Sequence, residues 1–200
     1  MNRHITRFAL MLLLTFLLVY LLTACCGLSF SINPGERTPI KCPAADILLD
    51  QDILPDIEWQ DVWQNTEDAS WRIGIDRAGA GFPTRNKGGI VQEVYLLKSA
   101  AEAEKEYDDL VDDLYRQTEF ISEWITPDPL LNVETEADKY RLACASDTLS
   151  DAVQCEFLAL YGPYIIELNV DIDAVQYADL ITLVSAIDEK AVACAEIQQK

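Results

Sequence analysis

The chain has 200 residues, of which half are hydrophobic and about a quarter are charged. This balance predicts one ordinary globular domain with a short additional segment, and only 8 glycines and 8 prolines exclude a collagen-like or low-complexity chain. Thirty-four acidic residues stand against 15 basic ones, and the net charge of −19 repels phosphate backbones, so nucleic acid is excluded as an expected partner.

Residues 1–24 have the three parts of a secretory signal peptide. Arg3 and Arg7 give a positive start, an apolar run follows over residues 8–22, and small residues lead up to Cys25. The apolar run is shorter than the roughly 20 residues that span a bilayer, so a cleaved signal is favoured over an uncleaved membrane anchor.

The segment Leu22-Thr23-Ala24-Cys25 resembles the lipobox of bacterial lipoproteins. The resemblance implies that Cys25 receives a diacylglyceryl group, that the chain is cleaved before this residue, and that the new amino group is acylated in bacteria that carry out that step. Two or three acyl chains anchor a protein stably. Cys26 offers a second register, but Thr23 would then occupy the position where the pattern prefers leucine.

Cleavage would leave a lipidated tether over residues 25–41 and a single extracytoplasmic domain over residues 42–200. The lipid would hold this domain at the cell surface or on the periplasmic face of a bacterial membrane. The one histidine, His4, would leave with the signal. A domain without histidine has neither a Ser-His-Asp nor a Cys-His site, and it lacks the usual zinc and copper ligands. We therefore expect a non-catalytic protein without a cofactor or a metal.

The remaining cysteines would lie in an oxidising compartment, where disulfides persist. Cys144 and Cys155 fall on two expected strands joined by a turn, so we expect them to pair across a hairpin. Cys42 opens the folded region and Cys194 lies near its end. A bond between these two would close a long loop and stabilise the fold by about 4–5 kcal/mol. Cys26 is left over, and no CxxC spacing points to a metal cluster or a redox centre.

The first half of the domain mixes short elements. Residues 44–52 suit a short helix, and residues 53–63 suit an irregular segment with a proline and two tryptophans. Residues 70–76 alternate in the manner of a strand, residues 79–89 form a glycine-rich loop, and residues 90–97 form a strand rich in β-branched and aromatic side chains.

The second half has clearer patterns. Ser99 followed by Glu102 is a capping box at the start of a long amphipathic helix that reaches residue 118. Three strands and a closing helix follow, with Asp173 as the expected N-cap of that helix. The strands are expected at residues 138–146, 153–161 and 164–171, and the helix at residues 174–196.

Strands that follow one another as hairpins predict an α+β fold, with a mainly antiparallel sheet and the helices packed on one face. The opening LLDQDILPDIEW, the helix AAEAEKEYDDL and the cysteine-bearing hairpin resemble the PsbP/Mog1-type lipoproteins and the extracellular sensor-like domains of bacterial kinases. The resemblance spans residues 42–197 and implies a binding or accessory module.

The acidic residues suggest two kinds of site. Asp108, Asp109, Asp112 and Asp113 lie within two helical turns, where a solvated helix face is favoured over a weak cation site. The pair Asp171 and Asp173 at a strand end is a second possible cation site.

Three further carboxylates lie on expected strands, but their sequence positions do not show which of them meet. A pair of carboxylates is the device that remains for catalysis without histidine. The candidates by placement are Glu93, Glu156 and Glu167.

A contact surface is expected near the glycine-rich loop, which matches no phosphate-binding motif. Arg77, Arg85 and Lys87 make it the basic patch of an acidic chain, and we expect either an exposed hairpin tip or a surface for an anionic ligand or a partner protein. A set of aromatic residues would either fill the core or line a cleft for sugars or apolar ligands. The set is Trp59, Trp63, Trp71, Trp124, Tyr161 and Tyr164.

Taken together, these observations predict a non-catalytic envelope lipoprotein that is attached to the membrane through its lipid and recognises an unidentified ligand or partner protein. One alternative is a carboxylate-based hydrolase that acts on envelope glycans. Another is a calcium-dependent adhesion module.

Overall fold

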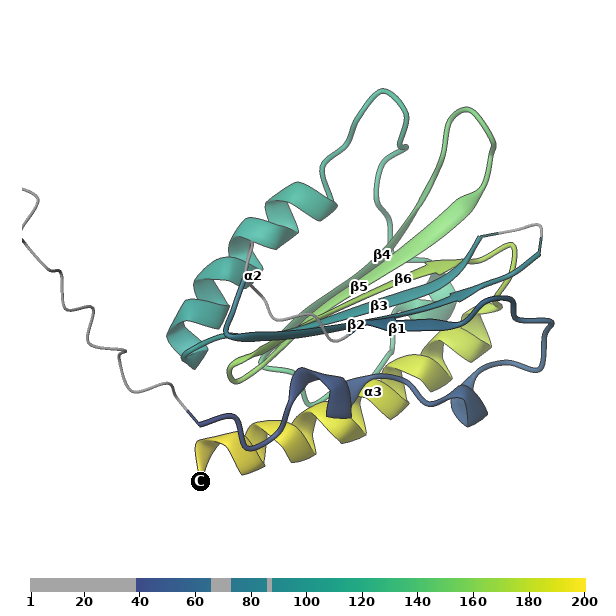
Figure 1. The fold of residues 1–200 in the computed structure, drawn as a ribbon. Coiled ribbons are helices and arrows are strands. Elements are labelled where there is room, and N and C mark those ends of the chain that lie inside the picture. Colours follow the sequence, from purple (N-terminus) through teal and green to yellow (C-terminus); the bar gives the residue numbers. More distant parts are fainter. Residues whose placement is uncertain (1–38, 66–72, 86–87) are drawn as a thin grey trace, which may run out of the picture. The chain divides into compact units, whose positions relative to one another are not determined.

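The computed structural model describes residues 39–65, 73–85 and 88–200. In this part of the chain, six strands form one antiparallel sheet in the order β1-β2-β3-β6-β5-β4 (Figure 1). The strands are β1 Trp63–Asn65, β2 Asp76–Pro83, β3 Gly89–Leu96, β4 Lys139–Ser146, β5 Val153–Tyr161 and β6 Tyr164–Asp171. The signal peptide, the lipobox with Cys25, and most of the expected tether lie outside the described residues.

Within the described residues, two α-helices and three short 3-10 helices accompany the sheet. They are η1 Ala44–Ile47, η2 Gln51–Ile53, α2 Ala100–Leu114, η3 Asp128–Leu130 and α3 Tyr177–Gln199. The hydroxyl of Ser99 accepts a hydrogen bond from the Glu102 amide at 3.2 Å, as expected of the N-cap of α2. The expected N-cap of α3 was wrong: Gln176 takes this role instead of Asp173, in a capping box with Asp179.

The α+β class and the antiparallel sheet are confirmed, but the two helices lie on opposite faces of the sheet instead of sharing one (Figure 1). The main core joins one sheet face to α3, and a second core joins the other face to α2. The reason is the burial of β5, where every residue from Cys155 to Tyr161 is buried. A strand with apolar side chains on both faces needs cover on both.

Strands β4, β5 and β6 agree with the expected strands to within one residue at each end. The expectation around β2 was wrong, because residues 73–75 form bends and the strand occupies Asp76–Pro83, inside much of the expected glycine-rich loop. Small residues fill the middle of this strand, so the large apolar side chains that mark a strand in sequence are missing there. Residues 70–72 lie outside the described residues.

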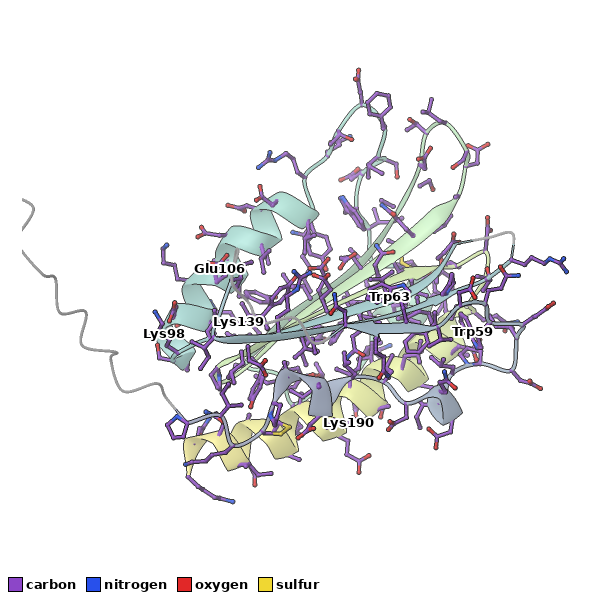
Figure 2. All side chains as sticks on the ribbon, in the orientation of Figure 1. Trp59, Trp63, Lys98, Glu106, Lys139 and Lys190 are labelled. Atoms are coloured by element: carbon purple, nitrogen blue, oxygen red, sulfur yellow. A yellow bond between two sulfur atoms is a disulfide. The ribbon has the colours of Figure 1, made fainter. Side chains whose placement is uncertain are left out.

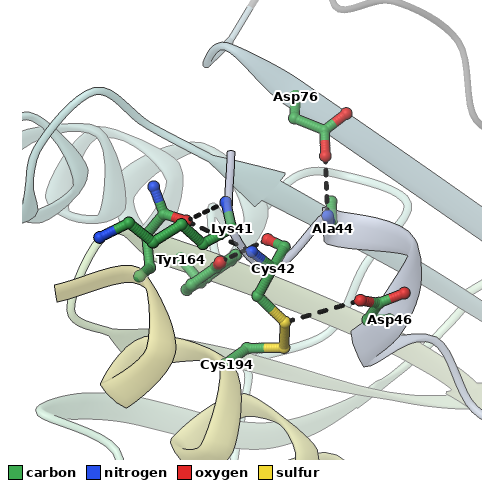
Figure 3. The surroundings of a disulfide bond; sticks show 8 residues. Lys41, Cys42, Ala44, Asp46, Asp76, Tyr164 and Cys194 are labelled. Atoms are coloured by element: carbon green, nitrogen blue, oxygen red, sulfur yellow. Dashed lines mark hydrogen bonds between the residues drawn. A yellow bond between two sulfur atoms is a disulfide. The ribbon is translucent and has the colours of Figure 1, made fainter. Parts of the chain in front are cut away.

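Both expected disulfides are present. Cys144 and Cys155 are direct partners in the β4–β5 ladder, with 4.0 Å between their Cα atoms. Cys42 is bonded to Cys194, which joins the start of the domain to α3 across 152 residues (Figure 3). The buried hydroxyl of Tyr164 donates to the carbonyl oxygen of Cys42 at 2.6 Å, so a second contact holds the same point.

The expected helix over residues 44–52 is present as two 3-10 helices, η1 and η2. The buried side chain of Gln92 holds the segment between them, because its Oε1 accepts from the Leu49 amide at 2.7 Å and its Nε2 donates to the Ile47 carbonyl at 3.2 Å. From the helix side, Lys190 donates to the carbonyl of Leu48 at 2.6 Å. These bonds fix the N-terminal segment on the α3 side of the sheet and leave the other face free of it.

Candidate functional site

The sheet face that packs against α2 changes character along its strands. Where α2 covers it, the face is apolar: Tyr95, Leu158 and Ile165 pack with Ala103 and Tyr107 of the helix. Side chains alternate between the two faces along each strand, and further along the strands the residues that point to this face are polar. We call this second region the polar half-face, and its members are Glu93 of β3, Gln154 and Glu156 of β5, and Glu167 and Asn169 of β6.

The polar half-face brings together the three carboxylates that the sequence had placed on strands without pairing them. Glu93 and Glu167 are direct partners in the β3–β6 ladder. Glu156 is the partner of Asn169, two residues further along β6. Direct partners in an antiparallel pair have Cα atoms about 4.5–5.5 Å apart, so these side chains are neighbours on one surface.

Glu156 is the most buried of the three, at 3% exposure. Its Oε2 accepts from the Asn169 amide at 2.8 Å, whereas its Oε1 is buried and has no hydrogen-bond partner among the described residues. Burial raises the pKa of Glu156 to about 8, and the nearby charge of Glu167 adds to the effect, although the Asn169 bond opposes it. At neutral pH this side chain is therefore mostly protonated.

Glu167 has a less extreme form of the same environment. Burial raises its pKa to about 7; the charge of Glu93 adds to this rise, and Arg77 opposes it. The raised pKa values of Glu156 and Glu167 place the ionisation of both carboxyls near neutral pH, where the charge of the half-face therefore changes.

Both carboxylate oxygens of Glu93 have a partner. Arg77 of β2 forms an ion pair with Oε1, and the hydroxyl of Tyr95 donates to Oε2. The Arg77 guanidinium also lies 5.4 Å from the centre of the Tyr95 ring. This arrangement fixes the orientation of Glu93 beside Glu167.

Aromatic side chains border the cluster on the β4 side. The Tyr115 hydroxyl lies 2.9 Å from the carbonyl oxygens of both Arg141 and Glu156, and the Arg141 guanidinium lies 4.0 Å from the centre of the Tyr115 ring. Trp124 packs edge-to-face against Tyr115 at 5.2 Å. Its Nε1 is buried and, among the described residues, has no acceptor. Two polar atoms without partners, an acceptor of Glu156 and a donor of Trp124, therefore belong to this side of the sheet.

A cavity of about 510 Å³ lies at the far end of the polar half-face, where β2, β3, β5 and β6 approach the loop between β4 and β5. Trp63, Val91, Gln154 and Asn169 are among its lining residues. Asn169 therefore belongs both to the cavity wall and to the hydrogen bond that holds Glu156. This volume is within the range of small-molecule sites.

Trp63, labelled in Figure 2, is an aromatic lining residue of the cavity, and glycines of β2 make room for its ring. A Cβ atom at Gly81 would approach Trp63 Nε1 to 2.2 Å, and one at Gly79 would touch the same ring at 3.6 Å. The Trp63 indole therefore occupies the space over Gly79 and Gly81 that larger side chains would fill, and Trp63 is 44% exposed. The sequence had assigned these glycines to a loop.

The expected basic patch is not one surface. Arg77 lies at the start of β2 and is paired with Glu93, whereas Arg85 lies beyond the other end of the strand and is exposed. Eight residues of extended chain separate the two by about 25 Å. Lys87 lies outside the described residues. The prediction of a single basic surface was wrong because Arg77 belongs to a strand, whereas the alternative of an exposed hairpin tip fits Arg85, which lies at the turn between β2 and β3.

The aromatic set divides between core and site. Tyr161 and Tyr164 are buried in the main core, and Trp59 packs against Phe82 at 6.3 Å. Trp63 and Trp124 are the members that border the polar half-face or its cavity, and Trp71 lies outside the described residues.

The acidic face of α2 has the form of a solvated helix surface. Asp108 is 3.1 Å from Lys139, and Asp113 is 2.6 Å from Arg116. At the end of β6, Asp171 Oδ1 accepts from the Asp173 amide at 2.9 Å. Over residues 39–65, 73–85 and 88–200, no group of three or more His, Cys, Asp or Glu side chains is arranged to hold a metal ion.

No protein-family model and no curated protein matches this chain. None of the helices within the described ranges has the length and apolar character needed to cross a membrane.

Proposed function

We propose that the chain is a lipoprotein of the bacterial cell envelope, anchored through Cys25, whose domain binds a small polar ligand on the polar half-face. The lipobox supports the anchor. Two disulfides in the domain are in keeping with an exported protein, because such bonds persist in oxidising compartments.

The observation that carries the binding proposal is the hydrogen bond that ties the buried Glu156 to Asn169, a residue that lines the cavity. A carboxyl group that is 3% exposed, with one oxygen unpaired, is costly to bury. Asn169 donates to this carboxyl and also lines the cavity, where Trp63 and Gln154 offer an aromatic surface and an amide. A cavity with a few convergent polar groups and a perturbed carboxyl has the characteristics of a binding site.

Photo-crosslinking in native envelopes tests this proposal. A benzoylphenylalanine at Val91, which lines the cavity and is 42% exposed, is expected to form a covalent adduct with the ligand. Ile197 of α3 is the matched control, since it is 45% exposed and is not a lining residue. Mass spectrometry of the labelled chain reports the adduct. Equal adducts at both positions, or none at Val91, would refute the binding site.

A second candidate is hydrolysis of envelope glycans by carboxylates, and the meeting of Glu93, Glu156 and Glu167 on one surface favours it. A carboxyl with a raised pKa can donate a proton near neutral pH, while Glu93 in its ion pair with Arg77 would serve as the carboxylate. If the full chain releases reducing sugar ends from envelope glycan, the Glu93→Gln variant is expected to lose this activity. Equal release by the wild type and the variant would exclude this role.

A further inference from the structure

The polar half-face becomes acidic when its buried carboxyls ionise, which happens close to neutral pH. Glu93, Glu156 and Glu167 face Arg77 of β2 and Arg141 of β4. The Arg77 charge is used in the ion pair with Glu93, and the Arg141 guanidinium lies over the Tyr115 ring. Asp147 and Asp171 also line the cavity, where Asp147 accepts from the amides of Leu149 and Ser150, and Asp171 accepts from the Asp173 amide. A ligand with positive charge complements the ionised carboxyls of the half-face.

An acidic surface alone does not define a ligand, but Glu156 adds a specific requirement. Its buried Oε1 lacks a hydrogen-bond donor among the described residues, and its other oxygen is tied to Asn169 of the cavity wall. A ligand ammonium close to this pair would favour the ionised form of the carboxyls, because an opposite charge within about 4–6 Å does so.

The polar groups that line the cavity favour a ligand with hydroxyl groups. Asn169 and Gln154 each carry an amide that both donates and accepts, and Ser150 and Thr84 add hydroxyls to the lining. The indole of Trp63 supplies an apolar surface beside them. A simple amine offers these groups only N–H donors, whereas a sugar ring offers hydroxyls to the amides and carbon–hydrogen faces to the indole.

The two regions are close enough for one short ligand. Val91 and Asn169 are ladder partners at the cavity, and Glu93 and Glu167 are the next pair on the same face, two residues along each strand. Two residues of strand correspond to about 7 Å. A sugar ring in the cavity therefore brings a substituent of its neighbouring ring within reach of Glu167, which is partly exposed.

From this arrangement we infer that the ligand is an oligosaccharide with free amino groups, whose hydroxyls occupy the Trp63 cavity while an ammonium lies against Glu167. This inference rests on the proposed binding function and specifies its ligand class.

Calorimetry of the full chain in detergent micelles at pH 7, close to the pKa of Glu167, tests the inference with three probes: a glucosamine tetramer, the fully N-acetylated tetramer, and spermidine. The glucosamine tetramer is expected to bind about tenfold or more tightly than the acetylated one, since a hydrogen bond to a charged group contributes about 1.5–3 kcal/mol. The Glu167→Gln variant is expected to remove this preference, and Trp63→Ala to weaken both tetramers.

Equal or tighter binding of the acetylated tetramer would overturn the amine requirement while leaving the binding site in place. Spermidine binding as tight as that of the glucosamine tetramer, with no effect of Trp63→Ala, would overturn the saccharide requirement. If no probe binds but the Val91 crosslinker captures an adduct, the ligand class is wrong and the site stands. If no probe binds and no adduct forms, both proposals fail. The comparison among probes is made on the wild type, so it holds even if a variant folds poorly.

Discussion

Replacing Glu156 by glutamine is expected to remove a large part of the pH dependence of stability. The pKa of this carboxyl is about 8 in the folded protein against an ordinary value of 4.5, chiefly because it is buried. Between these two values the folded state keeps a proton that the unfolded state has lost. The contribution to stability is therefore fully present below pH 4.5 and is lost as the pH rises toward 8.

The size of the effect follows from the same difference. One unit of pKa corresponds to about 1.4 kcal/mol, so ionising Glu156 in place costs up to roughly 5 kcal/mol at pH 9. Glutamine cannot ionise, and its amide oxygen can still accept from Asn169. Its extra N–H donors lack a partner and cost about 1–3 kcal/mol at every pH, so the informative quantity is the change between pH 5 and pH 9.

Urea unfolding of both proteins at pH 5 and pH 9 measures this change. The free energy of unfolding of Glu156→Gln, relative to that of the wild type, is expected to rise by several kcal/mol between the two values. Glu123→Gln is the control, because this side chain is exposed and its substitution should leave the two pH dependences parallel. Parallel curves for Glu156→Gln would show that the carboxyl titrates normally and would refute the buried cluster.

Three other changes have defined outcomes. Reducing the domain to one disulfide with Cys42→Ser and Cys194→Ser is expected to lower the free energy of unfolding by about 5 kcal/mol, because the bond closes a loop of 152 residues; urea unfolding with no loss would contradict this. Gly81→Ala is expected to displace the Trp63 indole and weaken saccharide binding as much as Trp63→Ala does, with no further loss in the double variant; additive losses would count against the contact. Cys25→Ala is expected to abolish incorporation of radiolabelled palmitate, and equal labelling would remove the lipid anchor.

The strands could be predicted from the sequence where their own residues are large and apolar. The runs that became β4, β5 and β6 carry large apolar residues and are separated by clear turn signals, such as Gly162-Pro163. In β2 the middle residues are small, and Trp63 from another strand supplies the missing bulk. The contact between Trp63 and β2 is a tertiary contact, so the spacing of residues within β2 does not predict it.

The side on which each helix packs depends on the burial of the central strands. Apolar residues at both odd and even positions of β5 and β6 were present in the sequence, and they indicate a sheet that is covered on both faces. The hairpin order alone favoured a one-sided sheet, because it does not show which faces the helices reach.

The site was predictable in its members but not in its geometry. Glu93, Glu156 and Glu167 were candidates because each lies on an expected strand. Their meeting depends on β3 pairing with β6, which are far apart in sequence, and on a register in which a slip of one residue would turn a carboxylate to the opposite face. Asn169 was missed, although it alternates with apolar neighbours in β6 and shares the face of Glu167.

The polar half-face is tested most directly by NMR of the tryptophan indole N–H groups while the glucosamine tetramer is added to the full chain. The signal of Trp63 is expected to move, since this residue lines the cavity. No shift of the Trp63 signal at saturation would contradict the central claim.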